Sequence, residues 1–70
     1  MTQGERIVKY MQDYGTITPM EAFSDLGITK LATRVSELRR EGVKINKEPV
    51  ERKNRYGEPV RYMQYSLEKE

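Results

Sequence analysis

Seventy residues make one small domain, which is too short to build a hydrophobic core and also enclose a deep substrate cavity. The complete absence of Cys and His excludes disulfides, thiol nucleophiles, imidazole bases and zinc sites with nitrogen or sulfur ligands. The net charge is only +2, yet residues 28–55 hold nine Lys or Arg against four Glu while both flanks are net acidic, which indicates either a surface that meets a polyanion or a solvated charged face.

The chain shows no feature of a membrane, secreted or catalytic protein. No apolar run approaches the ~20 residues that a membrane-spanning helix needs, and the first six residues lead into an amphipathic pattern instead of a signal-peptide core. The spacing of the Asp, Glu, Ser and Tyr residues assembles no nucleophile, base and orienting group. We therefore expect a cytoplasmic, non-enzymatic protein with one domain over residues 1–70, no metal ion, no cofactor and no small-molecule ligand.

The first segment predicts a helix that begins after Thr2 and ends at Gly15. Thr2 and Glu5 have the spacing of a capping box, in which each side chain accepts a backbone N–H of the other residue. The apolar residues that follow at helical spacing are Ile7, Val8, Met11 and Tyr14. Residues 16–17 are too few for more than a single β-bridge.

The second helix has clearer boundaries in the sequence. Thr18 is the expected N-cap, Pro19 occupies the first helical position and Glu21 completes a second capping box. The short apolar stripe consists of Ala22, Phe23 and Leu26, and Gly27 ends the helix. Because another helix starts after only a few residues, the pattern predicts a helix-turn-helix, with an ordinary corner between two helices as the alternative.

The third helix is expected over residues 29–41, with Thr29 as N-cap and Gly42 as the left-handed residue that ends it. At about 100° per residue, one arc of this helix is apolar and the opposite arc is polar. The residues expected to pack are Leu31, Ala32, Val35 and Leu38. The residues expected to be exposed are Lys30, Thr33, Arg34, Glu37 and Glu41.

After residue 42 the period of the apolar pattern changes from 3.6 to 2, which predicts a β-hairpin. Its strands are expected near 43–46 and 60–67, joined by a polar, basic loop over residues 50–59. Pro49 is expected to interrupt the first strand or to keep it at an edge of the sheet. Residues 68–70 have no apolar partner and are expected to fray.

These elements in this order resemble the winged helix-turn-helix family, above all its small stand-alone members in bacteria and their phages and the DNA-binding modules of bacterial repressors. The resemblance covers residues 4–67, and its most specific part is the segment Leu38-Arg39-Arg40-Glu41-Gly42 followed directly by a strand. It implies an α+β fold, namely a winged helix-turn-helix with three helices plus a C-terminal β-hairpin, the wing. It also implies DNA binding, as a transcriptional regulator or as an accessory factor for recombination.

In that family the second helix of the motif lies in the major groove and the wing touches the backbone or the adjacent groove. The resemblance therefore places residues 29–41 in the major groove of double-stranded DNA and the basic loop 50–59 on the backbone or in the minor groove. The implied contacts on the helix are Thr29, Lys30, Thr33, Arg34, Glu37 and Arg40. The implied contacts on the wing are Arg52, Lys53, Asn54 and Arg55. A phosphate contact is expected at Thr18.

The chemistry of these side chains suits their implied roles. Lys30 and Arg34 can donate to guanine, and Thr33 can contact a thymine methyl group. Glu37 can accept from cytosine N4, but it can equally pair with Arg34 or Arg40 on the helix surface. The three cations of the loop suit phosphate or minor-groove contacts, which give affinity more than sequence choice.

Two questions stay open at the level of the sequence. The acidic residues Glu37 and Glu41 favour a rival in which the domain binds a partner protein, as an inhibitor or adaptor, and Val60 and Tyr62 are then candidates for the partner surface. One recognition helix would cover only half of a symmetric site. Since no long helix is present to hold a dimer, we expect a monomer in solution that assembles, if at all, on DNA.

Overall fold

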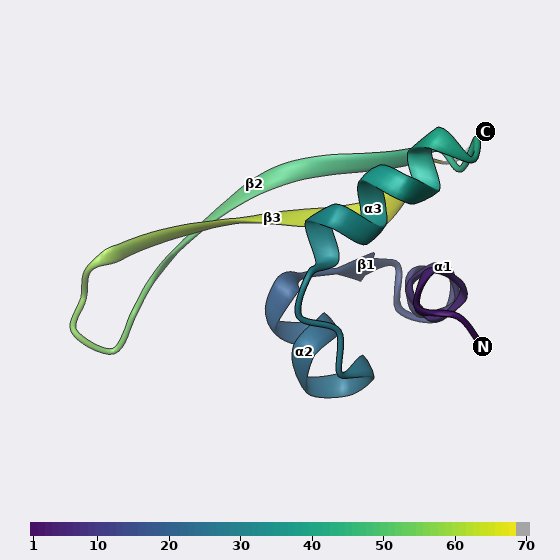
Figure 1. The fold of residues 1–70 in the computed structure, drawn as a ribbon. Helices are drawn as coiled ribbons and strands as arrows, with labels where there is room; N and C mark the ends of the chain where they lie inside the picture. Colours follow the sequence, from purple (N-terminus) through teal and green to yellow (C-terminus); the bar gives the residue numbers. More distant parts are fainter. Residues whose placement is uncertain (69–70) are drawn as a thin grey trace.

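The computed structural model describes residues 1–68, which form three helices and one three-stranded antiparallel sheet (Figure 1). The elements are α1 (Gln3–Tyr14), β1 (Thr16–Ile17), α2 (Pro19–Leu26), α3 (Leu31–Arg40), β2 (Ile45–Lys53) and β3 (Pro59–Leu67). The strand order in the sheet is β1-β3-β2. The predicted fold class, with three helices and a C-terminal hairpin, is confirmed.

The first two helices begin at the predicted caps. The Thr2 hydroxyl accepts the Glu5 backbone N–H at 3.1 Å, but the Glu5 carboxylate accepts from the Thr2 hydroxyl and not from its backbone, so the predicted capping box of α1 is only half correct. At α2 both halves of the box are present, between Thr18 and Glu21. The N-terminus of α2 is therefore satisfied by its own side chains.

The third helix starts later than predicted. Lys30, and not Thr29, is the N-cap of α3, and no side chain caps the helix there. Its C-terminus is as predicted, because Gly42 has a φ of +99°, which only glycine adopts without strain. This conformation lets the Val43 N–H bond the Leu38 carbonyl at 3.0 Å, and the chain turns directly into the hairpin.

The core lies between the helices and the inner end of the sheet. Ile7, Ile17 and Ile28 are its most deeply buried large side chains. From α3 it receives Leu31, Val35 and Leu38. Three residues predicted to pack are exposed instead, namely Tyr14, Phe23 and Ala32. In the first helix Tyr10 is buried instead.

The hairpin is longer and more regular than predicted. β2 and β3 pair without interruption from Ile45 opposite Leu67 to Lys53 opposite Pro59, so only residues 54–58 form the loop and the predicted loop over 50–59 is wrong at both ends. Pro49 does not interrupt the strand but lies in an edge strand, where its missing N–H is tolerated. The expected bridge at residues 16–17 forms two pairs with β3.

Cross-strand pairs explain why the strands continue into the polar segment. Val50 lies opposite Tyr62, and Glu51 lies opposite Arg61, with an ion pair of 3.6 Å between the last two side chains. Residues 51–61 are all exposed, and Figure 1 shows this end of the wing running well beyond the helices. Of the predicted frayed tail 68–70, the Glu68 N–H bonds the Lys44 carbonyl, and the last two residues lie outside the described chain.

Candidate nucleic-acid interface

The exposed face of α3 carries small side chains around one cation, Arg40. Since Leu31, Val35 and Leu38 face the core, helical geometry places Ser36 and Arg40 on the opposite side. Thr33 and Ala32 flank this side and are also exposed. A helix with a face of this kind can approach a groove closely, because no large apolar side chain stands on it.

This face is rotated from the one that the sequence pattern predicts. The sequence pattern includes Ala32 among the packed residues, which shifts the centre of the expected exposed face toward Arg34, Glu37 and Glu41 and leaves Ser36 out of that face. If only the large apolar residues define the packed arc, Ser36 falls on the exposed face. The structure thus adds two residues to the expected exposed face of α3. They are Ala32 and Ser36, the smallest side chains on it.

Arg34 lies at the edge of the exposed face and is paired. Its Nη1 atom lies 2.6 Å and 3.0 Å from the two carboxylate oxygens of Glu37, while its Nε atom is buried and has no hydrogen-bond partner among the described residues. Only 34% of the Arg34 side chain is exposed. Both residues line a hollow of about 440 Å³ with the first residues of α1, and Glu41 adds a second carboxylate there.

The other predicted cations of α3 are free to act. Lys30 and Arg40 are exposed, at the start and at the end of the helix, and neither forms an ion pair within residues 1–68. Thr29 is exposed beside Lys30. Arg39 differs from them, because its guanidinium donates to the Ile45 carbonyl at 2.6 Å and fastens α3 to the wing.

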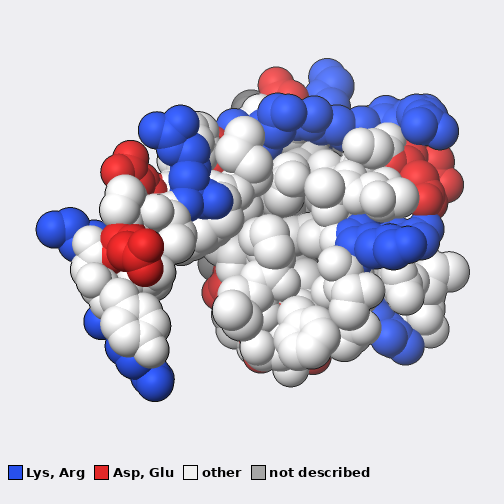
Figure 2. Space-filling view, turned by 60° about the vertical axis from the view of Figure 1, so that its left-hand side comes forward, with Lys and Arg blue, Asp and Glu red and all other residues white. Residues whose placement is uncertain are grey.

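The two basic residues at the end of β2 point to opposite faces of the wing. Paired residues share a face and successive residues alternate, so Arg52 lies with Val60 and Lys53 lies with Pro59 on the other side. The Arg52 guanidinium donates to the Tyr62 hydroxyl at 2.9 Å, which holds it along the strand. Figure 2 shows Lys and Arg side chains over the wing and along the upper edge of the body.

The loop at the tip is organised by Asn54. Its side-chain oxygen accepts the backbone N–H groups of Tyr56, at 2.9 Å, and Glu58, at 3.0 Å. The loop is completed by Gly57, which has a φ of +77°. Asn54 therefore shapes the tip, and the side chains left pointing outward are those of Arg55 and Tyr56, the second of which was not predicted as a site residue.

The surroundings of Thr18 do not favour a phosphate contact. Thr18 is 8% exposed, its hydroxyl accepts the Glu21 N–H at 3.2 Å, and its own N–H is bonded to the Glu21 carboxylate at 3.0 Å. The carboxylate would also repel a phosphate at this end of α2. Thr18 therefore caps α2 and is not among the proposed DNA contacts.

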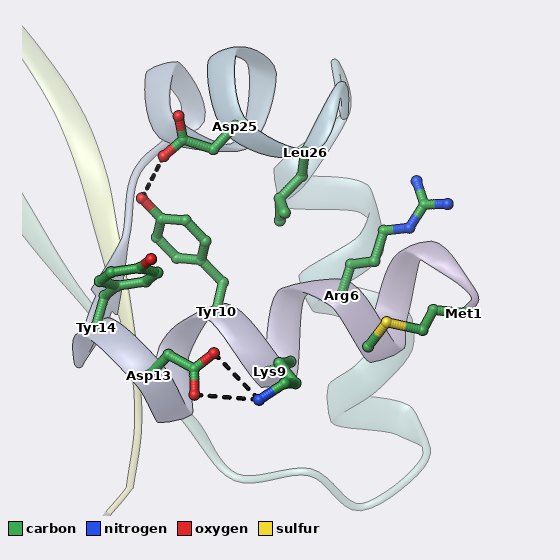
Figure 3. A pocket seen from close by; sticks show the side chains of 8 residues that line it. All are labelled: Met1, Arg6, Lys9, Tyr10, Asp13, Tyr14, Asp25 and Leu26. Carbon is green, nitrogen blue, oxygen red and sulfur yellow. Dashed lines mark hydrogen bonds and ion pairs between the residues drawn. The ribbon is translucent and has the colours of Figure 1, made fainter.

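A separate hollow of about 430 Å³ lies between α1 and α2 (Figure 3). The Tyr10 hydroxyl reaches across it and donates to Asp25 at 2.6 Å, and Lys9 pairs with Asp13 at its edge. The hydrogen bond to Asp25, reinforced by desolvation, raises the pKa of Tyr10 above its usual value of 10.0. These contacts join the two helices, and within residues 1–68 no cluster of acidic side chains has the arrangement of a metal site.

One of three comparisons with known proteins found a match, and a separate search of the helices bears on membranes. No helix within residues 1–68 has the length and apolarity to cross a membrane. A search of curated proteins and a search of solved structures each found no match to the chain. A family model described as winged helix-turn-helix domain matches residues 2–70, nearly the whole chain. Since the match extends from α1 through the wing, the chain belongs to the winged helix-turn-helix family, whose domains in general bind DNA.

Proposed function

We propose that the chain binds double-stranded DNA, with α3 in the major groove and the wing on the backbone or in the adjacent minor groove. The proposal is supported by two exposed surfaces that carry basic residues. One is the face of α3, which has no large apolar side chain, and the other is the wing, which projects beyond the body. A recognition helix needs such a face to approach base edges. The biological role would be that of a cytoplasmic transcriptional regulator or a recombination accessory factor, in bacteria or their phages.

The two surfaces are expected to make different kinds of contact with DNA. Lys30, Thr33 and Arg34 supply donors and a methyl group for base edges, each good bidentate contact being worth roughly 1–3 kcal/mol of discrimination. Arg40, and Thr29 just before the N-cap of α3, are exposed and can meet phosphates at the rim of the groove. On the wing, the cations give affinity and orientation. Glu37 acts mainly by holding Arg34.

Fluorescence anisotropy of a mixed-sequence duplex, measured over a salt series, tests the proposal. Each phosphate contact contributes about 0.9 to the slope of log K against log salt, so we expect affinity to fall steeply as salt rises. Arg40→Glu and Arg55→Glu should each weaken binding strongly. Arg6→Glu makes the same charge change on α1 and should leave most of the affinity. Flat titrations at low salt would exclude duplex DNA as the ligand.

A protein partner is the second candidate, and one feature favours it. The hollow between the start of α2 and the wing, about 550 Å³, is lined largely by apolar groups that include Pro19, Met20, Val60 and Tyr62. Met20 is 72% exposed, and Figure 2 shows a broad area of uncharged side chains beside the wing. Under this alternative, Met20→Asp abolishes capture of a partner from host extract while no variant binds DNA.

The lengths of the helices bear on a proposal for the oligomeric state. A single α3 covers half of a symmetric operator, and neither α1 nor α3 is long enough to form a zipper. We propose a monomer in solution that gains partners only on DNA. Sedimentation of the free protein, and of the complex with duplexes of increasing length, distinguishes this state from a preformed dimer.

A further inference from the structure

Tyr56 stands at the outermost point of the wing with its ring in solvent. It is 83% exposed, more than any other large hydrophobic residue among residues 1–68, and it has no hydrogen bond or aromatic partner through its side chain there. It follows Arg55 in the loop that joins the two longest strands of the sheet. An aromatic ring in this position has no part in the core and is available to a ligand.

The loop holds Tyr56 firmly. The Tyr56 N–H is bonded to the Asn54 side chain, and the loop is closed by hydrogen bonds from Asn54 N–H to the Glu58 carbonyl at 2.9 Å and from Gly57 N–H to the Asn54 carbonyl at 3.0 Å. The strands are paired up to Lys53 and Pro59, directly before the loop. The tip is thus preorganised, and less conformational entropy is lost when it binds than with a mobile loop.

The cations behind the tip lie on both faces of the wing. Arg52 is on one face, and Lys53 is on the other. A wing lying flat on one DNA strand would use only one of these faces. A wing that inserts its tip into a groove has a phosphate strand on each side, and both faces then meet negative charge.

We propose that the wing enters the minor groove tip first and that Tyr56 is a wedge, whose ring inserts between base pairs and bends the duplex. This inference rests on the proposed DNA binding and specifies how the wing achieves it. Aromatic and apolar wedges open a base step and kink the helix axis toward the major groove. Arg55, beside the ring, is placed to meet the groove floor or its wall.

A tryptophan at position 56 tests the contact directly, because the chain contains no Trp. Tyr56→Trp should bind a mixed-sequence 16-base-pair duplex, and its emission should be quenched severalfold and become shielded from acrylamide. Tyr14→Trp is the matched control, since Tyr14 is similarly exposed but lies on α1. Its emission and its acrylamide accessibility should not change when DNA binds.

The bend distinguishes a wedge from a surface contact. Energy transfer between dyes on the two duplex ends should rise with the wild-type protein and with Tyr56→Phe, which keeps the ring. With Tyr56→Ala the bend should disappear and the affinity should fall about tenfold, within the range known for loss of a base–aromatic stack.

Each outcome decides the proposal. Anisotropy that rises while the indole of Tyr56→Trp stays accessible to acrylamide overturns the wedge and leaves DNA binding intact. A shielded indole with an unbent duplex, or equal bending by Tyr56→Ala, overturns the wedge in favour of a contact with sugar or phosphate. If the anisotropy does not change with any duplex, the proposed DNA binding is overturned, and the wedge is overturned with it.

Discussion

The guanidinium of Arg34 and the carboxylate of Glu37 form a two-oxygen contact one helical turn apart on α3, with the shorter distance at 2.6 Å. The pair occupies the edge of the proposed reading face, so one of the two cations that the sequence offers to guanine is held by its neighbour in the free protein. An exposed pair of this kind stabilises a helix by only about 0.3–0.5 kcal/mol, which DNA can overcome.

Glu37→Gln is therefore expected to raise DNA affinity. The substitution releases Arg34 and removes a negative charge from the face that approaches the phosphates, so affinity should increase several-fold and the salt dependence should steepen. The increase should be largest for non-specific duplexes, because Glu37 restrains a donor that otherwise contacts many sites. Anisotropy at two salt concentrations measures both effects.

Glu68→Gln provides the control for Glu37→Gln, since it makes the same charge change at an exposed position after β3. It should leave binding nearly unchanged. If Glu37→Gln instead weakens binding, Glu37 accepts a hydrogen bond from a base and is a specificity residue in its own right.

The wing should lose affinity equally when either of its faces is neutralised. Arg52→Ala and Lys53→Ala remove cations from opposite faces, and each is expected to reduce the salt slope by about 0.9. The double variant should show the sum of the two effects. A loss with only one of the two variants would mean that the wing lies flat on the backbone. Arg6→Ala, on α1, serves as control.

Asn54→Ala should disorder the tip without unfolding the domain. The substitution removes the acceptor of the Tyr56 and Glu58 amides, while the core and the strand pairs remain. Hydrogen exchange should show faster exchange at these two amides and unchanged protection at Tyr65, which is buried. DNA affinity should fall with it, although the net charge is unaltered.

Asn54→Asp keeps the side-chain oxygen that accepts the two amides and replaces only the NH2 group of Asn54. The carboxylate can still accept both amides, so protection at Tyr56 and Glu58 should largely return. Unchanged exchange in Asn54→Ala would show that the remaining backbone hydrogen bonds suffice to hold the tip.

The sequence pattern predicts the architecture well because caps, stripes and alternation are local signals. Thr18 with Glu21 and the left-handed Gly42 stand as expected, and β3 packs Met63, Tyr65 and Leu67 on the core. The length of the wing was not predictable in the same way. Its outer strands have no core to face, and they are held by pairs such as Glu51 with Arg61 across a register that only the folded hairpin defines.

The candidate site was predictable in composition but less so in geometry. The identity of the basic residues is evident from the charge distribution, whereas the rotation of α3 depends on whether a small residue such as Ala32 is packed. The Asn54 side chain accepts backbone amides of its own loop, and the Thr18 side chain caps its own helix. These hydrogen bonds became visible only in the folded backbone. Tyr56 carries no periodic signal at all.

The contact between Tyr10 and Asp25 makes a prediction about alkaline pH. The hydrogen bond favours the neutral phenol and raises the pKa of Tyr10 in the folded protein above 10.0, its usual value in an unfolded chain. Its contribution to stability is thus fully present below pH 10 and is lost as the pH rises above that value, since the unfolded chain releases the proton first. Tyr10→Phe removes the hydrogen bond and should lower the free energy of unfolding at pH 7.

Urea titrations of wild type and Tyr10→Phe between pH 7 and 11 measure the difference. It should be constant up to about pH 9 and shrink toward pH 11, because only the wild type carries a phenol that ionises on unfolding at this position. The other four tyrosines are common to both proteins, so their titration cancels in the comparison. Tyr56→Phe is the control, since the Tyr56 ring is exposed and far along the wing from Tyr10, and it should track the wild type across the range. A difference that stays constant to pH 11 would show that Asp25 does not hold the phenol proton in the folded state.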